Sequence, residues 1–456
     1  MAHDNFIFAL PLELREQVYK EVFRSPNSSL DIIHTCRELR NEAYKFQFQR
    51  TITFGSRAHL YTWLRQTAQE HLAHVVDVRF IVHDVSLDNL MESRDEEDPL
   101  AYGSGRLLTW DLYEADLRIF SQALLKIPHL KRITIRATPL RQSFLYRKYL
   151  NNLLEILASL YPSLSGLSLE GTMHHQRLSF LMCFERLESL TFVGFSAPSA
   201  SETIGTLKGM DRLKRSSLVT QQTMLTPTSS MHNSFATKRQ SITGEVMRRI
   251  SNLTYFPVTE CLPSRSPDLF VSTATLKSLH PLQSLTSFAL HMFCTPDVKT
   301  LQALQAFLES SKIGHLSLDW PEIDANTLDE CLPVTDALRT LWIRAENICS
   351  AASILCSLWE SRKAGELSGL EAIVLIRAAI GDEHHQSNVG ERRTNAAEVA
   401  KDNLDDGKSD TENTVWLRKE LQSLGVHVAW CTENPQSQTP SELEVRKSST
   451  HLTVCG

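Results

Sequence analysis

Side chains that could bind a metal or carry out catalysis form no recognised set in this sequence. The two histidine pairs are His174-His175 and His384-His385, and the densest group of thiols is Cys331, Cys349 and Cys356. No cysteine or carboxylate completes either histidine pair at the spacing of a zinc site. The sequence also lacks a Gly-rich phosphate loop, a Gly-x-Ser-x-Gly elbow and a His-Glu-x-x-His motif. We therefore expect no enzyme activity and no cofactor or metal, and we interpret the three cysteines as small apolar core residues.

The composition is that of an ordinary globular protein, with 42% hydrophobic and 22% charged residues among 456. The formal net charge of −6 disfavours a general nucleic-acid binder, which needs a basic face. No apolar run is long enough to predict a membrane span, and the first residues lack the basic region of a secretory signal. The nine scattered cysteines are then typical of a reducing compartment, so we expect a cytoplasmic or nuclear protein.

A short apolar pattern recurs along most of the chain. It consists of an apolar residue, two variable residues, an apolar residue, one variable residue and a third apolar residue. After the first strand, Val75–Phe80, it is found at Leu130/Ile133/Ile135, Leu164/Leu167/Leu169, Leu187/Leu190/Phe192, Leu285/Phe288/Leu290, Ile313/Leu316/Leu318, Leu338/Leu341/Ile343 and Leu370/Ile373/Leu375. Stretches with helical apolar spacing separate these motifs, which predicts an α/β array of parallel strands with crossover helices.

The first 55 residues have a different pattern. Pro11 suits the first turn of a helix, and an apolar stripe at helical spacing follows it. Ser25-Pro26 ends this helix, a second helix begins near Asp31, and Thr51–Phe54 is predicted to be a short strand. These residues are therefore interpreted as a small helical head.

This head resembles an F-box, and it is most similar to the divergent F-box-like motif of many fungal proteins. The resemblance rests on Leu10-Pro11-Leu12-Glu13-Leu14 and on the segment Thr35–Ala43. It implies that the head docks on the Skp-type adaptor of a cullin ubiquitin ligase and that the repeats hold a protein substrate. The adaptor-binding residues implied are Leu10, Pro11, Leu12, Val18 and Val22. The alternative is that the same residues only cap the repeat array, because the end of an array needs a unit with a polar outer face.

The repeats resemble leucine-rich repeats of the ribonuclease-inhibitor-like kind, without the regular Asn or Cys after the last strand position. This resemblance implies a binding surface on the outward strand positions. The candidate partner-binding residues there are Arg136, Glu170, His291, Asp319, Trp342 and Arg344. Trp342 and Arg344 are of the residue types enriched at binding hot spots, although Trp342 could instead pack on a neighbouring strand or an insertion.

The sequence thus predicts an F-box-like head at 1–55 and a repeat array in two parts, at 56–195 and 282–380. A Ser/Thr-rich segment at 196–281 and a charged segment at 381–411 are interpreted as flexible insertions. A terminal helix and strand at 412–432 and a disordered tail at 433–456 complete the prediction. The expected function is that of a substrate receptor of a Skp/cullin ubiquitin ligase, which contacts the adaptor and an unknown protein substrate but no nucleic acid or membrane. The alternative is a leucine-rich-repeat scaffold with no link to ubiquitin.

Overall fold

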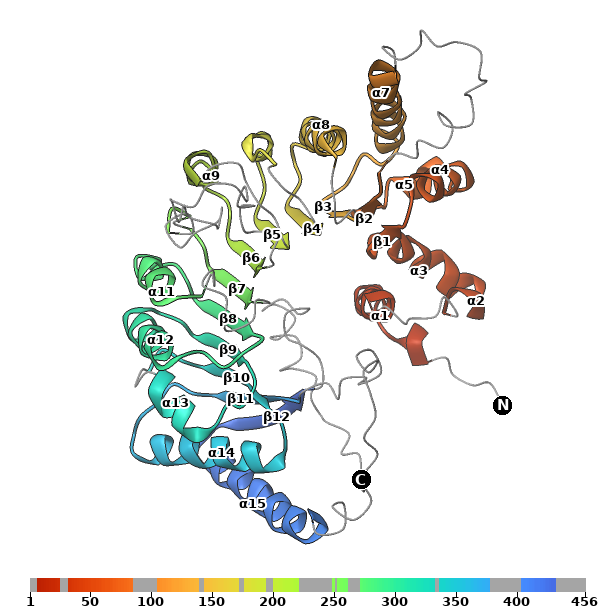
Figure 1. The fold of residues 1–456 in the computed structure, drawn as a ribbon. Coiled ribbons are helices and arrows are strands. Elements are labelled where there is room, and N and C mark those ends of the chain that lie inside the picture. Colours follow the sequence, from red (N-terminus) through yellow and green to blue (C-terminus); the bar gives the residue numbers. More distant parts are fainter. Residues whose placement is uncertain are drawn as a thin grey trace, which may run out of the picture. The chain divides into compact units, whose positions relative to one another are not determined.

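Parallel strands that follow one another in sequence order build each of the two units of this chain (Figure 1). The computed structural model describes residues 6–24, 32–84, 105–138, 143–171, 176–193, 200–220, 248–250, 252–260, 271–332, 336–377 and 403–431. The first unit contains the described residues up to Leu213, and the second begins at Lys214. We describe each unit by itself.

The head of the first unit is helical, as predicted. Its elements are the 3-10 helix η1 (Phe6–Ala9) and the helices α1 (Leu12–Arg24), α2 (Ile32–Thr35) and α3 (Arg37–Gln49). Pro11 precedes α1, and its carbonyl accepts the N–H groups of Leu14 and Arg15. Cys36 separates α2 from α3, and its Sγ accepts the N–H of Leu39 as an N-cap. The second predicted helix is therefore two helices, with the break at Cys36.

Strands and helices then alternate through the rest of the first unit. The strands are β1 (Ile52–Phe54), β2 (Asp77–Val82), β3 (Arg132–Ala137), β4 (Gly166–Gly171) and β5 (Ser189–Val193). The helices are α4 (Arg57–Gln66), α5 (Gln69–Leu72), α7 (Gly105–Leu124), α8 (Phe144–Leu160), the 3-10 helix η3 (Ser179–Cys183) and α9 (Ala200–Lys208). Each strand from β1 to β5 pairs in parallel with the next one.

The second unit continues the same alternation. Its strands are β6 (Arg215–Thr220), β7 (Tyr255–Glu260), β8 (Ser287–Met292), β9 (His315–Asp319), β10 (Thr340–Ala345), β11 (Ala372–Arg377) and β12 (His427–Cys431). Its helices are α11 (Thr273–Leu279), α12 (Val298–Ser310), α13 (Ala325–Cys331), α14 (Ile348–Lys363) and α15 (Asn403–Ser423). These helices lie along one face of the strands (Figure 1).

The predicted apolar pattern sets the register of the strands in both units. In the second unit, Phe288, Leu316, Leu341 and Ile373 stand opposite one another on β8 to β11. The residues two positions further along form the next row, and all of these side chains are buried. The same holds in the first unit for the rows that begin at Val78 and Phe80 of β2. The expected α/β array of parallel strands is thus confirmed, because successive motifs bury one continuous apolar layer.

The interpretation of 196–281 as an insertion needs correction. Helix α9, strands β6 and β7 and helix α11 all lie in this segment, and β7 pairs with both β6 and β8. Leu253, Phe256 and Val258 repeat the apolar pattern and are buried. This repeat was not predicted from the sequence because its flanks are rich in Ser and Thr and because it contains Pro257. Pro257 is accommodated in β7, opposite Ala289 of β8.

Helix α15 begins at Asn403, inside the segment 381–411 that was interpreted as a flexible insertion. The terminal helix and strand predicted after it are confirmed as α15 and β12. The predicted tail at 433–456 lies outside the described residues. Among the helices that the structure describes, none has the length and apolar character needed to cross a membrane.

Candidate interaction surfaces

Helix α1 is anchored to the head by a compact apolar core. The buried residues of this core are Tyr19, Phe23, Ile33, Leu39, Ala43 and Phe46. The rings of Tyr19 and Phe46 lie 6.1 Å apart, so α1 packs directly on α3. Leu39 lies in the Thr35–Ala43 segment and belongs to this core.

Polar contacts fix the same side of α1. The carboxylate of Glu42 on α3 accepts hydrogen bonds from Arg15 at 2.8 Å and from the Tyr19 hydroxyl at 2.9 Å. Burial, together with the hydrogen bond to this carboxylate, raises the pKa of Tyr19 to about 12. Arg15 also donates to the carbonyl of Leu10, so the residue before Pro11 is held in the same network. The buried side of α1 therefore has a fixed orientation on α3.

Four apolar side chains near the start of the head, in contrast, are exposed to solvent. Leu10, Leu12, Leu14 and Val18 are between 37% and 46% exposed. They supply four of the fifteen large apolar side chains that are exposed among the described residues, within a stretch of nine. Leu14 and Val18 are four residues apart and share one helix face, whereas Leu12 is the first residue of α1 and Leu10 precedes the helix. The exposed residues 10, 12, 14 and 18 are together called the head stripe hereafter.

Most of the predicted adaptor-binding residues belong to the head stripe. Leu10, Leu12 and Val18 are members, Pro11 is exposed beside them, and Val22 is partly buried at the end of the same helix. None of the head-stripe residues belongs to the apolar core of the head. Sequence reasoning missed only Leu14 as a surface residue, although its spacing of four from Val18 was a usable signal.

The predicted partner-binding residues of the first unit are close neighbours on adjacent strands. Arg136 of β3 stands opposite Glu170 of β4. The carboxylate of Glu170 forms an ion pair with Arg79 of β2, at 2.7 Å. Arg136 is exposed and Glu170 is partly buried. The structure thus brings both predicted residues together and adds Arg79 to them.

Three of the predicted residues of the second unit form a charged cluster across β8, β9 and β10. The Nδ1 of His291 lies 2.5 Å from one carboxylate oxygen of Asp319, and the Nε of Arg344 lies 3.1 Å from the other. The Asp319 side chain is only 6% exposed, while His291 and Arg344 are each 23% exposed. A buried carboxylate needs such partners, because removing its charge from water is costly.

The expectation that Trp342 and Asp319 are exposed is wrong. Trp342 is 6% exposed and Asp319 is 4% exposed as whole residues. The alternative for Trp342, that its side chain is packed inside the protein, therefore agrees with the structure. The physical reason is that strands β7, β8 and β10 are buried on both faces, as is common for parallel sheets.

The residues first considered for chemistry are not brought together. Cys331 is buried, and burial raises the pKa of its thiol to about 12. Cys349 is exposed, Cys356 is partly exposed, and both histidine pairs lie outside the described residues. Within the part of the chain that the structure describes, no group of three His, Cys, Asp or Glu side chains is placed to hold a metal ion. The described side chains instead form apolar and charged surfaces that are suited to binding.

Comparison with known proteins adds no functional assignment to this geometry. No family model matches the chain, and no curated protein matches it.

Proposed function

We propose that this protein is an F-box-type substrate receptor, whose head docks on the Skp-type adaptor of a cullin ubiquitin ligase. The observation that carries the proposal is the head stripe, a group of exposed apolar side chains at the start of a helix that its own core holds in place. Solvent-exposed apolar side chains in such a cluster are typical of an interaction site.

The exposure of the head stripe favours docking over capping. If Leu10, Pro11 and Val18 only closed the end of the array, they would pack against the first repeat and be buried. They are exposed instead, and the head contacts the following elements through α3, which packs on α5, and through β1, which pairs with β2. An amphipathic helix that presents a few apolar anchors is a common mode of recognition between proteins.

The charged and partly exposed strand residues of the two units support the second half of the proposal, the binding of a protein substrate. Arg136 with Glu170 in the first unit, and His291 with Arg344 in the second, offer polar groups at the surface of rigid strands. Side chains on adjacent strands are held at fixed spacings, which gives a partner a preorganised surface.

We expect the full-length tagged protein to co-purify with the Skp-type adaptor, and the Leu14→Asp/Val18→Asp variant to lose it. Two carboxylates in an apolar interface cannot be desolvated without a partner, so retention should fall by at least about tenfold. Both residues are exposed in the free protein, so the variant should keep its fold, which circular dichroism and thermal unfolding check.

The matched control is Lys20→Glu, which changes the charge of the same helix by the same two units. Lys20 is exposed and lies about 120° around the axis from Leu14 and about 160° from Val18. This control should retain the adaptor. Failure of the wild-type chain to retain the adaptor, or equal retention by all three proteins, would contradict the proposal.

A further inference from the structure

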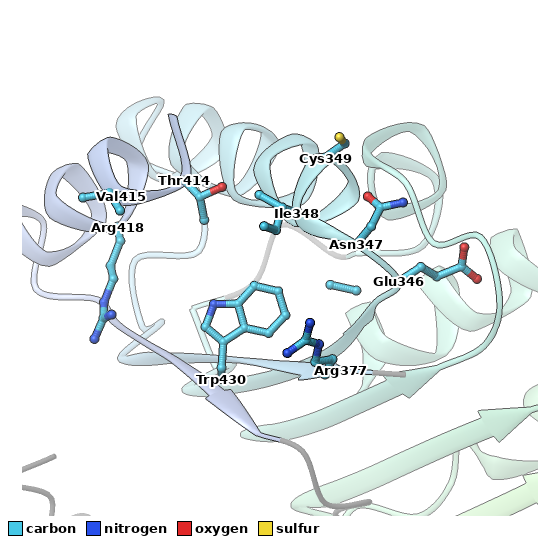
Figure 2. A pocket seen from close by; sticks show the side chains of 10 residues that line it. Glu346, Asn347, Ile348, Cys349, Arg377, Thr414, Val415, Arg418 and Trp430 are labelled. Carbon is cyan, nitrogen blue, oxygen red and sulfur yellow. The ribbon is translucent and has the colours of Figure 1, made fainter. Parts of the chain in front are cut away.

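A pocket of about 640 Å³ lies within the second unit, where β10, β11 and β12 end. Ala345 ends β10, Arg377 ends β11, and Trp430 lies one residue before the end of β12. The start of α14 and the middle of α15 complete the wall (Figure 2). The pocket thus occupies the carboxyl ends of parallel strands, which is where ligands commonly bind in α/β folds.

The floor of the pocket is apolar. Trp430 stands in the middle of it, with Ile348 of α14 and Val415 of α15 on either side (Figure 2). These three side chains are 42–49% exposed, although they come from three separate elements. Trp430 stands opposite Leu375 in the strand register, and Leu375 is fully buried. The exposed tryptophan therefore occupies a position that is core in the preceding strand, and here it lines the pocket instead.

The volume of the pocket suits a small-molecule ligand rather than part of a protein partner. Pockets of roughly 300–1,000 Å³, mostly apolar and with a few polar groups, are typical of small-molecule sites. An aromatic ring in the floor offers a flat contact for an apolar body.

The charge at the pocket is positive. Arg377 places its guanidinium beside the Trp430 ring, whereas Arg418 of α15 lies on the other side with its guanidinium directed away from the ring (Figure 2). Both arginines are exposed. No described carboxylate forms an ion pair with either arginine. The one acidic residue in the lining, Glu346, points away from the ring and accepts the N–H of Glu322. The first turn of α14 adds partial positive charge from its backbone N–H groups.

We propose that this pocket binds a small organic anion with an apolar body, whose carboxylate or sulfonate is held by Arg377, while Arg418 adds positive charge at the opposite edge. The apolar body would lie on Trp430 between Ile348 and Val415. An arginine fork pairs well with a carboxylate or a sulfonate, because its N–H groups match the two oxygens of the anion. The site stands apart from the proposed adaptor docking, because its residues all belong to the second unit.

The test is a fluorescence titration of the full-length protein with 8-anilinonaphthalene-1-sulfonate, an apolar aromatic probe with one sulfonate. Its matched neutral probe is N-phenyl-1-naphthylamine, which lacks the sulfonate. We expect a saturable component of sulfonate-probe binding that the Ile348→Asp variant removes. Val298→Asp is the control for Ile348→Asp, since Val298 is also exposed and also the first residue of a helix.

The charge requirement is tested with Arg377→Gln/Arg418→Gln. This variant should weaken the saturable binding of the sulfonate probe by at least about tenfold, since a hydrogen bond to a charged group contributes about that factor. Binding of the neutral probe should change less than about twofold, because that probe has no sulfonate to pair with an arginine. Arg65→Gln/Lys419→Gln removes two exposed positive charges elsewhere, Lys419 being next to Arg418 on α15, and should leave both probes unchanged.

Competition identifies the ligand class. Decanoate should displace the sulfonate probe from the wild-type protein, whereas 1-decanol at equal concentration should not. The proposal is overturned if the double arginine variant binds the sulfonate probe as tightly as the wild type. It is equally overturned if decanol competes as well as decanoate, or if Ile348→Asp leaves the saturable component intact.

Discussion

Replacing Gly171 by alanine is expected to lower the free energy of unfolding of the first unit by about 3 kcal/mol or more. Gly171 ends β4 with a φ of +82°, a backbone region that favours glycine. A Cβ added there would overlap the backbone carbonyl of Ala137 on β3, which has no freedom to move away. The substitution must therefore push β4 from β3 or strain its last residue.

Hydrogen exchange of the full-length protein measures this effect locally, in the peptides that contain β3 and β4. Gly55→Ala is the matched control in the same unit, because a Cβ at Gly55 has open space around it. Its effect should stay below about 1 kcal/mol. Because Glu170 precedes Gly171, the Gly171→Ala variant should also weaken the ion pair between Glu170 and Arg79. Equal protection of β3 and β4 in the two variants would contradict the description of this close approach.

The second large effect is expected at the charged cluster of the second unit. Arg344→Met should lower the free energy of unfolding by about 3 kcal/mol, because Asp319 is left buried with only His291 as a partner. Replacing both members, in Asp319→Leu/Arg344→Met, should restore stability to within about 1 kcal/mol of the wild type, since no buried carboxylate remains. Denaturant unfolding of the single and double variants measures the difference.

The control for Arg344→Met is Arg339→Met, just before the same strand. Arg339 pairs with Glu371 at 2.5 Å, but the two side chains are 61% and 49% exposed. An exposed pair of this kind contributes at most about 1 kcal/mol. If the two methionine variants are equally stable, or if the double variant is less stable than Arg344→Met alone, the cluster is not a buried ion pair in solution.

The apolar pattern made much of the fold predictable. Each motif places two apolar side chains on one strand face and a third just before the strand. The register could therefore be expected from residues such as Leu316, Leu341 and Ile373 alone. The repeat at Leu253, Phe256 and Val258 escaped notice because proline and polar flanks are rare in buried strands. The composition of this segment favours a loop, whereas its pairing with β6 and β8 makes it a strand of the sheet.

The surfaces were only partly predictable, because exposure depends on residues far away in sequence. The head stripe could be predicted in large part, since Leu10 to Val18 lie on one short helix and its approach. The burial of Trp342 depends on what covers the second face of the sheet, which no local pattern encodes. The pocket around Trp430 joins a strand end, the start of α14 and the middle of α15, and its residues share no motif.

The most direct test of the account is hydrogen–deuterium exchange of the full-length protein with and without the purified Skp-type adaptor. We expect the adaptor to slow exchange in the peptides that span residues 10–22, where the head stripe lies, and to leave the strands of the second unit unchanged. Binding that protects other segments and leaves residues 10–22 unaffected, or no binding at concentrations well above those of a specific complex, would contradict the proposed docking.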